Sequence, residues 1–156
     1  EQAGALEEGK ADVLGLYMVA KLKEKGELGG ADMTDNYVTY LASLFRSIRF
    51  GATEAHGRAN LAQFLFFQQM GAFSRDAATG TYRVAPPKME AAMNALSEKI
   101  LKLQGDGDYE GVVAFLPKKG TMDETLAKDL ARLAEADIPT DVVFKQGIDV
   151  LQGASN

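Results

Sequence analysis

The sequence has 156 residues, of which 46% are hydrophobic and 25% are charged, a composition typical of one soluble globular domain that can bury a core. A formal net charge of -5 argues against nucleic acid as the main partner, and no apolar run reaches the length needed to span a membrane. The absence of cysteine excludes disulfides and thiolate metal ligands and fits a reducing or an oxidising compartment, of which we slightly favour the cytoplasm over the periplasm.

The first predicted element is a helix near residues 4–25, whose apolar side chains repeat at the helical period. The apolar residues that share one side of it are Leu6, Val13, Tyr17 and Ala20. Glu8 and Asp12 lie four residues apart on the opposite side, and Glu7 points in a third direction. Because the upper part of the helix is apolar nearly all round, we expect it to be buried, and buried carboxylates need a cation, a metal or hydrogen-bond donors.

Acidic side chains near the start of a helix also have a purely structural explanation. They complement the positive end of the helix dipole, and Lys21, Lys23 and Lys25 complement the negative end before Gly26 stops the helix. From composition alone, this structural explanation is favoured over a functional one.

A second helix is predicted near residues 35–50, with Asp32 or Thr34 as its cap. Arg46 and Arg49 lie close together near its C-terminus, where positive charge is favourable. We interpret the two arginines as mainly structural, with the alternative that one of them helps to bind a substrate carboxylate.

A third helix is predicted near residues 54–71, capped by Thr53 and apolar on most sides, so it should run through the core. His56, Asn60 and Gln63 nevertheless line up along it at steps of four and three residues. A polar stripe on an otherwise buried helix indicates the wall of a cleft. For a lone histidine, however, a hydrogen-bonded core or capping residue is the more common explanation.

The rest of the chain predicts one β-hairpin near residues 73–84, where alternating side chains flank a glycine-containing turn. Three further helices are expected near residues 87–104, 109–116 and 122–136. Pro86-Pro87 suits the first turn of one of them, residues 105–108 form a turn and cap, and Thr121 with Glu124 forms a capping box.

These elements predict a mainly α fold, a helical domain of about six helices with one small β-hairpin. We expect residues 1–150 to form a single mostly helical domain and residues 151–156 to form a flexible tail. An extended segment or strand is expected just after Pro139. Since the chain has no internal repeat and no sharp linker, nothing divides it further.

One motif matches a known family. The run Glu7-Glu8-Gly9-Lys10-Ala11-Asp12, followed by Val13-Leu14-Gly15-Leu16-Tyr17, resembles the second zinc motif of the dipeptidyl peptidase III metallopeptidases, Glu-Glu-x-Lys/Arg-Ala-Glu/Asp on a helix. The resemblance continues through SLFRSIRFG, AHGRA and VFKQG, nearly from end to end, as the C-terminal part of a much longer enzyme. It implies that Glu8 is a zinc ligand and that Glu7 and Asp12 do not bind zinc themselves but hold the histidine ligands of the zinc.

The resemblance also assigns roles in the third predicted helix. His56 matches a family histidine that contacts substrate and stabilises the transition state without binding zinc. The family arginine one turn later is replaced by Asn60, and Arg58 is offset from it, so Asn60 and Arg58 are only weak candidates for substrate binding.

The chain departs from the family in lacking the first zinc motif, His-Glu-x-x-Gly-His, and His56 is its single histidine. A catalytic zinc site needs about three protein ligands. We therefore expect a fragment of a larger metallopeptidase that binds zinc in the intact enzyme, holds none tightly alone and is inactive by itself. Its expected partners are a peptide substrate and the remainder of the parent enzyme, with no nucleic acid and no membrane.

Two other hypotheses stay open at this point. The chain could be a non-catalytic helical interaction module that kept the scaffold and lost the chemistry. It could also be a plain acidic helical domain without a site, which the clustered carboxylates of the first helix make less attractive. The sequence that precedes Glu1 in the gene product separates the first alternative from the peptidase.

Overall fold

The computed structural model describes residues 2–30, 32–141, 144 and 147. Within these residues it has six helices and one antiparallel hairpin, which confirms the mainly α fold. The elements are α1 (Gln2–Glu24), α2 (Met33–Ile48), α3 (Ala55–Gln69), β1 (Phe73–Arg75), β2 (Tyr82–Val84), α4 (Pro86–Gly105), α5 (Tyr109–Phe115) and α6 (Glu124–Glu135). Every predicted helix and the hairpin are found, with ends that differ by at most two residues.

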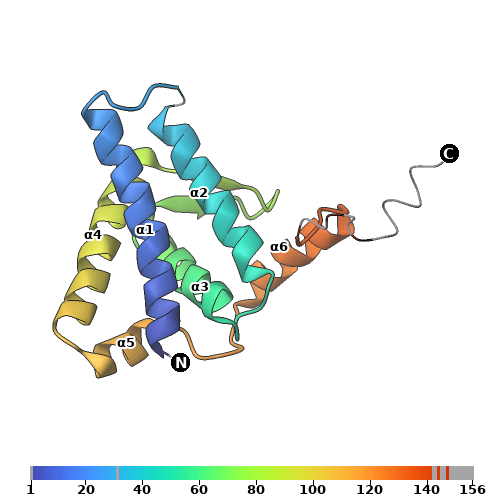
Figure 1. Cartoon of the computed structure of the whole chain (residues 1–156). Helices are drawn as coiled ribbons and strands as arrows, with labels where there is room; N and C mark the ends of the chain where they lie inside the picture. The colour runs from blue at the N-terminus through green and yellow to red at the C-terminus, as the bar shows by residue number, and fades with distance from the viewer. Residues whose placement is uncertain (1, 31, 142–143, 145–146, 148–156) are drawn as a thin grey trace.

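The helices are arranged around α3, which packs against α1, α2 and α4 (Figure 1). The short α5 closes the lower end of this group, and α6 projects from its side. No helix among the described residues is both long and apolar enough to cross a membrane. The strand expected just after Pro139 falls largely on residues that the structure does not describe, and so does the expected tail at 151–156.

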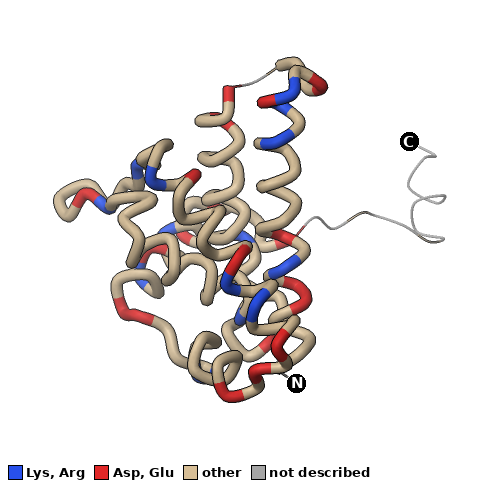
Figure 2. The backbone as a smooth tube through the Cα atoms, turned by 90° about the vertical axis from the view of Figure 1, so that its left-hand side faces the viewer, with Lys and Arg blue, Asp and Glu red and all other residues tan. Residues whose placement is uncertain are grey.

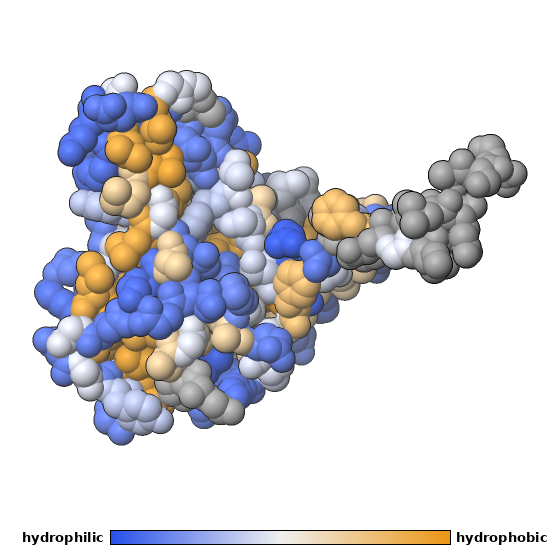
Figure 3. Space-filling model, in the orientation of Figure 1, coloured by the Kyte–Doolittle hydropathy of each residue, from blue (hydrophilic) through white to orange (hydrophobic). Residues whose placement is uncertain are grey.

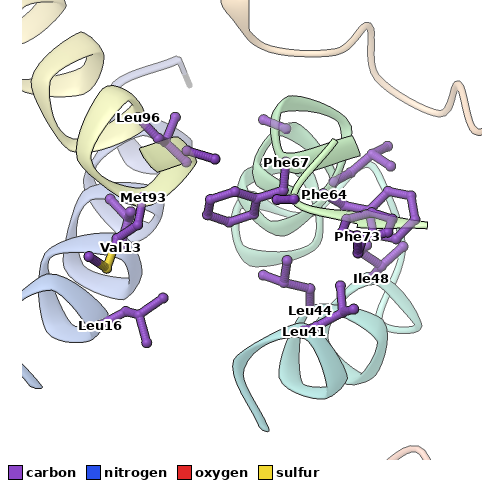
Figure 4. Close-up of a cluster of buried hydrophobic side chains, with 14 of the residues drawn as sticks. Val13, Leu16, Leu41, Leu44, Ile48, Phe64, Phe67, Phe73, Met93 and Leu96 are labelled. Atoms are coloured by element: carbon purple, nitrogen blue, oxygen red, sulfur yellow. The ribbon is translucent and has the colours of Figure 1, made fainter. Parts of the chain in front are cut away.

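The core forms where α3 meets its neighbours, because its aromatic side chains point in more than one direction. Phe64 and Phe67 are almost completely buried, at 2% and 0% exposure. Figure 4 shows Phe67 between side chains of α1 and α4 on one side and those of α2 on the other. Phe64 meets β1 through Phe73, with ring centroids 4.9 Å apart. The expectation that this helix runs through the core is therefore confirmed.

The expectation that the upper part of α1 is buried all round is wrong. Its buried residues lie on one face, and they are Ala5, Leu6, Gly9, Val13, Leu16 and Ala20. On the other face Met18 is 53% exposed and Gly15 is open to solvent. The reason is that neighbouring helices cover one side of α1, so part of its apolar sequence lies on the surface as an exposed strip (Figure 3).

Two of the predicted helix starts are confirmed in detail. Asp32 caps α2, its Oδ1 accepting a hydrogen bond from the backbone N–H of Thr34 at 3.0 Å. Pro86 and Pro87 occupy the first turn of α4, where a missing N–H costs nothing.

Two other predicted caps are corrected. The residue before α3 is Glu54, not Thr53, and it makes no capping bond with its side chain. Helix α6 is capped by Asp123, whose Oδ1 accepts from the N–H of Thr125 at 2.8 Å. Thr121 instead donates to the carbonyl of Lys118, which keeps it in the preceding turn. In both places several adjacent polar residues could serve as the cap, and the path of the incoming chain selects among them.

Helix α6 is tied to the hairpin by one buried carboxylate. Asp129 is 7% exposed and accepts two hydrogen bonds from Arg75, Nε to Oδ2 at 2.6 Å and Nη2 to Oδ1 at 2.8 Å. The hydroxyl of Tyr82 donates to the same Oδ2 at 2.6 Å. The Arg75 guanidinium lowers the pKa of Asp129 to about 2, because it stabilises the ionised form. This cluster anchors the helix that projects most from the body.

Replacing each of two helical glycines by alanine should change the free energy of unfolding in opposite directions. In Gly57→Ala the new Cβ would overlap the carbonyl oxygen of Gly51, whereas at Gly15 nothing lies within 4 Å of such an atom. We expect Gly57→Ala to lower the free energy of unfolding by about 1–3 kcal/mol and Gly15→Ala to raise it by about 0.5–1 kcal/mol. Urea unfolding of the two variants measures both, and equal effects would contradict the close packing at Gly57.

The Asp129 cluster makes stability depend on pH in a defined direction. The pKa of Asp129 is lowered in the folded state from its ordinary 3.8, so its contribution is complete above that value and is lost as the pH falls towards 2. We expect Asp129→Asn to cost about 2 kcal/mol at pH 7, with most of the difference gone near pH 2. Urea unfolding at both pH values tests this, with the exposed Asp106→Asn as control, and a pH-independent difference would contradict it.

Candidate functional site

The acidic end of α1 lies against the beginning of α3, and this contact brings most of the predicted site residues together. The charged residues of α1 are confined to its two ends, with none between Asp12 and Lys21 (Figure 2). Gly9 lies at the contact, where a Cβ would be 3.7 Å from Ala59 Cβ and 3.8 Å from Gln63 Nε2. A small residue at position 9 therefore lets α3 approach the acidic turn of α1 closely.

Glu8 and His56 form the exposed part of this contact. Nε2 of His56 lies 2.8 Å from Oε2 of Glu8, an ion pair when the imidazole is protonated and a hydrogen bond when Nε2 carries the proton of the neutral ring. The side chains are 62% and 39% exposed for His56 and Glu8. Oε1 of Glu8 accepts no hydrogen bond from the described residues, so this oxygen is open to a group from elsewhere.

Asp12 forms the inner part of the contact and is half-buried. Its Oδ2 accepts hydrogen bonds from two amides of α3, Asn60 Nδ2 at 3.2 Å and Gln63 Nε2 at 3.3 Å. Burial raises the pKa of Asp12, while the two amide donors act in the opposite direction. Asn60 also donates to the backbone carbonyl of His56 at 2.9 Å, so the same amide links the carboxylate to the turn that carries the histidine.

Glu7 is directed towards α4 and does not join this cluster. Its Oε2 lies 2.6 Å from Lys10 Nζ, and its Oε1 accepts a hydrogen bond from the amide of Gln104. Lys10 also donates to Gln104 Oε1 at 2.9 Å, which closes a small network between α1 and α4. The hydrogen bond from Lys10 lowers the pKa of Glu7.

The polar stripe of α3 has a different role from the one its spacing indicated. Asn60 and Gln63 are 3% and 1% exposed, so they do not line an open cleft. They provide the donors that the half-buried Asp12 requires. Behind them the hydroxyl of Tyr40 donates to Gln63 Oε1, and sequence reasoning did not single out this tyrosine.

The arginines lie in other parts of the structure. Arg58 is buried, and its Nε donates to the carbonyl of Pro117 at 2.8 Å, which fixes the segment between α5 and α6. Arg46 Nη2 lies 3.0 Å from Asp141 Oδ1, and Arg49 donates to the carbonyls of residues 138 and 139. These contacts agree with the structural interpretation of Arg46 and Arg49.

A cavity of about 750 Å³ lies between α2, the hairpin and α6. Arg46 and Arg49 are on its wall with apolar side chains such as Phe45 and Leu133, but none of the predicted zinc-site residues is. This cavity is therefore separate from the contact between α1 and α3.

The described residues do not by themselves form a zinc site. They contain no group of three or more histidine, cysteine, aspartate or glutamate side chains placed to hold a metal ion. Glu8 can supply one carboxylate ligand, and its neighbour His56 already hydrogen-bonds to it. Because a catalytic zinc ion takes about three protein ligands, the remaining ligands would have to come from outside the described part of the chain.

The sequence of this chain is similar to part of a much longer plant protein. No protein-family model matches the chain. It is 39% identical over 142 residues to Nudix hydrolase 3 of Arabidopsis thaliana, which is 91% of this chain but only 18% of that protein. Because this chain matches less than a fifth of that protein, the name of the whole protein does not tell what the similar segment does.

Two solved structures have the same fold over most of this chain. Dipeptidyl peptidase III from Caldithrix abyssi matches with a TM-score of 0.84 and 36% identity, over 91% of this chain and 27% of that one. Dipeptidyl peptidase III from Corallococcus sp. strain EGB matches with a TM-score of 0.80 and 37% identity, over 91% of this chain and 26% of that one. The chain is thus dipeptidyl peptidase III-like in sequence and fold, and it spans about a quarter of those chains.

Proposed function

We propose that this chain is a catalytic-region segment of a zinc-dependent, dipeptidyl peptidase III-like enzyme that hydrolyses short peptides. The observation that carries the proposal is the contact between Glu8 and His56, whose polar atoms lie 2.8 Å apart. The two residues are far apart in sequence, and each was assigned a role by a separate motif. Their closeness in a fold that resembles dipeptidyl peptidase III supports the proposal that both belong to one site.

Glu8 acts in this proposal as a zinc ligand. His56 occupies its Oε2, and Oε1 remains for the metal. Zinc, when bound, polarises the substrate carbonyl and lowers the pKa of a bound water. Two histidine ligands and the general base come from the remainder of the parent enzyme, which carries the His-Glu-x-x-Gly-His motif, so the chain alone is inactive.

Glu7 and Asp12 orient those histidine ligands by accepting their imidazole N–H groups. Each carboxylate is held by neighbouring side chains, Glu7 by Lys10 and Asp12 by Asn60. His56 donates a hydrogen bond to the oxyanion that develops on the substrate, and its exposed ring is accessible for this purpose. Substrate binding by Asn60 and Arg58 is a weaker part of the proposal, since both side chains are buried.

The alternative function is a non-catalytic helical interaction module on the same scaffold. It keeps the helices and the carboxylates of this chain without zinc chemistry, and this sequence, which does not include the His-Glu-x-x-Gly-His motif, does not separate it from the peptidase. The sequence of the complete gene product decides between the two. A His-Glu-x-x-Gly-His motif before Glu1 favours the peptidase, and its absence favours the module.

In the complete protein, four alanine variants should separate coordination from catalysis. Glu8→Ala should abolish tight zinc binding, and Glu7→Ala or Asp12→Ala should weaken it about 10–100-fold, as expected for residues that orient ligands. His56→Ala should leave zinc in place and lower kcat on the order of 100-fold, because it removes an oxyanion donor. Metal analysis and steady-state kinetics on the same preparations provide both readouts.

Glu24→Ala is the matched control, since Glu24 lies at the other end of α1 and pairs with Lys21 three residues away, as Glu7 pairs with Lys10. It should change neither zinc content nor kcat. Equal zinc loss in all four site variants would indicate a general loss of folding and would remove the support for a ligand role of Glu8.

The isolated chain should not retain zinc at micromolar concentration and should show no peptidase activity. It offers the carboxylates of Glu7, Glu8 and Asp12 and one imidazole to a metal that prefers nitrogen or sulfur ligands. Calorimetric titration of the purified chain with zinc measures this directly. Saturable one-to-one binding tighter than about 1 μM, roughly 8 kcal/mol, would mean that the chain carries a complete metal site of its own.

A further inference from the structure

A line of three hydrogen-bonded side chains runs from α2 through α3 to α1. Tyr40 of α2 donates its hydroxyl to Gln63 Oε1, and Gln63 Nε2 donates to Asp12 Oδ2 at 3.3 Å. Gln63 is 1% exposed, and burial raises the pKa of Tyr40 well above its ordinary value, so this phenol stays protonated and remains a donor. We call these three residues the Tyr40–Gln63–Asp12 line.

The charge of Asp12 fixes the direction of every hydrogen bond in the line. An ionised carboxylate only accepts hydrogen bonds, so the NH₂ end of the Gln63 amide must face Asp12. The carbonyl end of Gln63 then faces Tyr40, whose hydroxyl must donate to it. Asn60 uses its NH₂ group in the same way, on Asp12 Oδ2 and on the carbonyl of His56. The orientation of both amides thus follows from a single negative charge.

The donors on α3 all reach the same oxygen of Asp12. Asn60 and Gln63 both bond to Oδ2, at 3.2 Å and 3.3 Å, and Oδ1 accepts nothing from the described residues. Oδ1 is also not fully buried. In the described part of the chain, the fully buried side-chain polar atom without a hydrogen bond is Ser97 Oγ, so Oδ1, which likewise has none, must keep some contact with solvent. One oxygen is therefore held in place, while the other is not fully buried and has no donor among the described residues.

We infer that Gln63, supported by Tyr40, is a positioning residue that holds Asp12 so that Oδ1 can accept the imidazole N–H of a zinc-binding histidine from the rest of the enzyme. This inference rests on the proposed function, in which Asp12 orients such a histidine. Without Gln63, Asn60 would be the single donor left at Oδ2, so the carboxylate could rotate more freely about its Cβ–Cγ bond and the direction of Oδ1 would be less well fixed. A residue that orients a metal ligand acts only while it is itself held still.

The buried position of Gln63 makes a purely space-filling role a poor explanation. Its neighbours on α3 include Phe64 and Phe67, which contact the apolar core. Burying an amide among such residues is unfavourable unless both of its ends are hydrogen-bonded, and here both ends are. A methionine of similar length would fill the same space without this requirement, so Gln63→Met removes the positioning function and leaves most of the packing.

The test is a double-mutant cycle on zinc affinity in the complete zinc-containing protein, measured by competition with a chelator. We expect Gln63→Met to weaken zinc binding about 10-fold and Tyr40→Phe about 3-fold, smaller effects than that of Asp12→Ala. In an Asp12→Ala background, neither change should weaken zinc binding further, because both residues act through Asp12.

Tyr82→Phe is the matched control. It also removes one hydroxyl that donates to a partly buried side chain, but the acceptor is Asp129, in the cluster that ties α6 to the hairpin. It should lower the urea unfolding midpoint about as much as Tyr40→Phe and leave zinc affinity unchanged. If Gln63→Met does not fold, Tyr40→Phe decides the question by itself, since it deletes a single oxygen.

Each outcome has a distinct meaning. If Asp12→Ala weakens zinc binding but Gln63→Met and Tyr40→Phe do not, the inference is wrong and the proposed function stands. Additive losses in the double variants, or an equal loss in Tyr82→Phe, would also overturn it, since they would indicate general destabilisation. If Asp12→Ala leaves zinc affinity unchanged, the proposed role of Asp12 fails, and the inference fails with it.

Discussion

The packing of α1 on α3 is the contact on which both the core and the candidate site depend. Along one part of this contact the side chains are apolar, with Val13 and Phe67 fully buried. Another part of the contact is polar, where Asp12 accepts hydrogen bonds from the side-chain amides of Asn60 and Gln63. A shift of one helix along the other would move Asp12 away from its donors and leave a half-buried charge without partners, which is strongly unfavourable. The hydrogen bonds of Asp12 therefore help to fix how far α1 and α3 are shifted along each other, and with that the pairing of their apolar side chains.

Most of the fold could be predicted from the sequence because helical periodicity is a strong local signal. In α2 the apolar residues at helical spacing are Tyr37, Leu41, Leu44, Phe45 and Ile48; four of them are buried as this spacing predicts, and Phe45 is half-buried. What periodicity cannot supply is how many sides of a helix its neighbours cover, and this is why α1 was expected to be more buried than it is. The Arg75–Asp129 cluster was missed for a related reason, since its residues belong to elements far apart in the chain.

The candidate site shows the same division between local and long-range information. The stripe of His56, Asn60 and Gln63 was visible in the sequence, but its partner Asp12 lies on another helix, and without that partner the stripe was interpreted as a cleft wall. The closeness of Glu8 and His56 could be expected only from the family resemblance. Tyr40 carried no signal, because a tyrosine next to an apolar stripe looks like any other packing residue, and only the structure shows its hydroxyl donating to an amide.

Two acids near the start of α1, Asp12 and Glu7, are held in environments of opposite character. Burial raises the pKa of Asp12, so ionising it opposes folding, and this penalty disappears as the pH falls and the carboxyl takes up a proton. Lys10 lowers the pKa of Glu7, so its ionised form favours folding, and that contribution is lost as the pH falls below its ordinary 4.5. Folding alone therefore gives no reason to keep a charge at position 12.

A charge at position 12 is nevertheless what an imidazole N–H donor from another segment would require. The protein surrounds Asp12 with two buried amides that favour its ionised form and leaves one of its oxygens open. Glu8 and His56, by contrast, are exposed and contribute little to stability, as is usual for surface ion pairs. Glu8 and His56, which would touch metal or substrate, thus lie at the surface of this chain, whereas Asp12, one of the two residues that would orient a ligand, is half-buried, where neighbouring helices can hold it still.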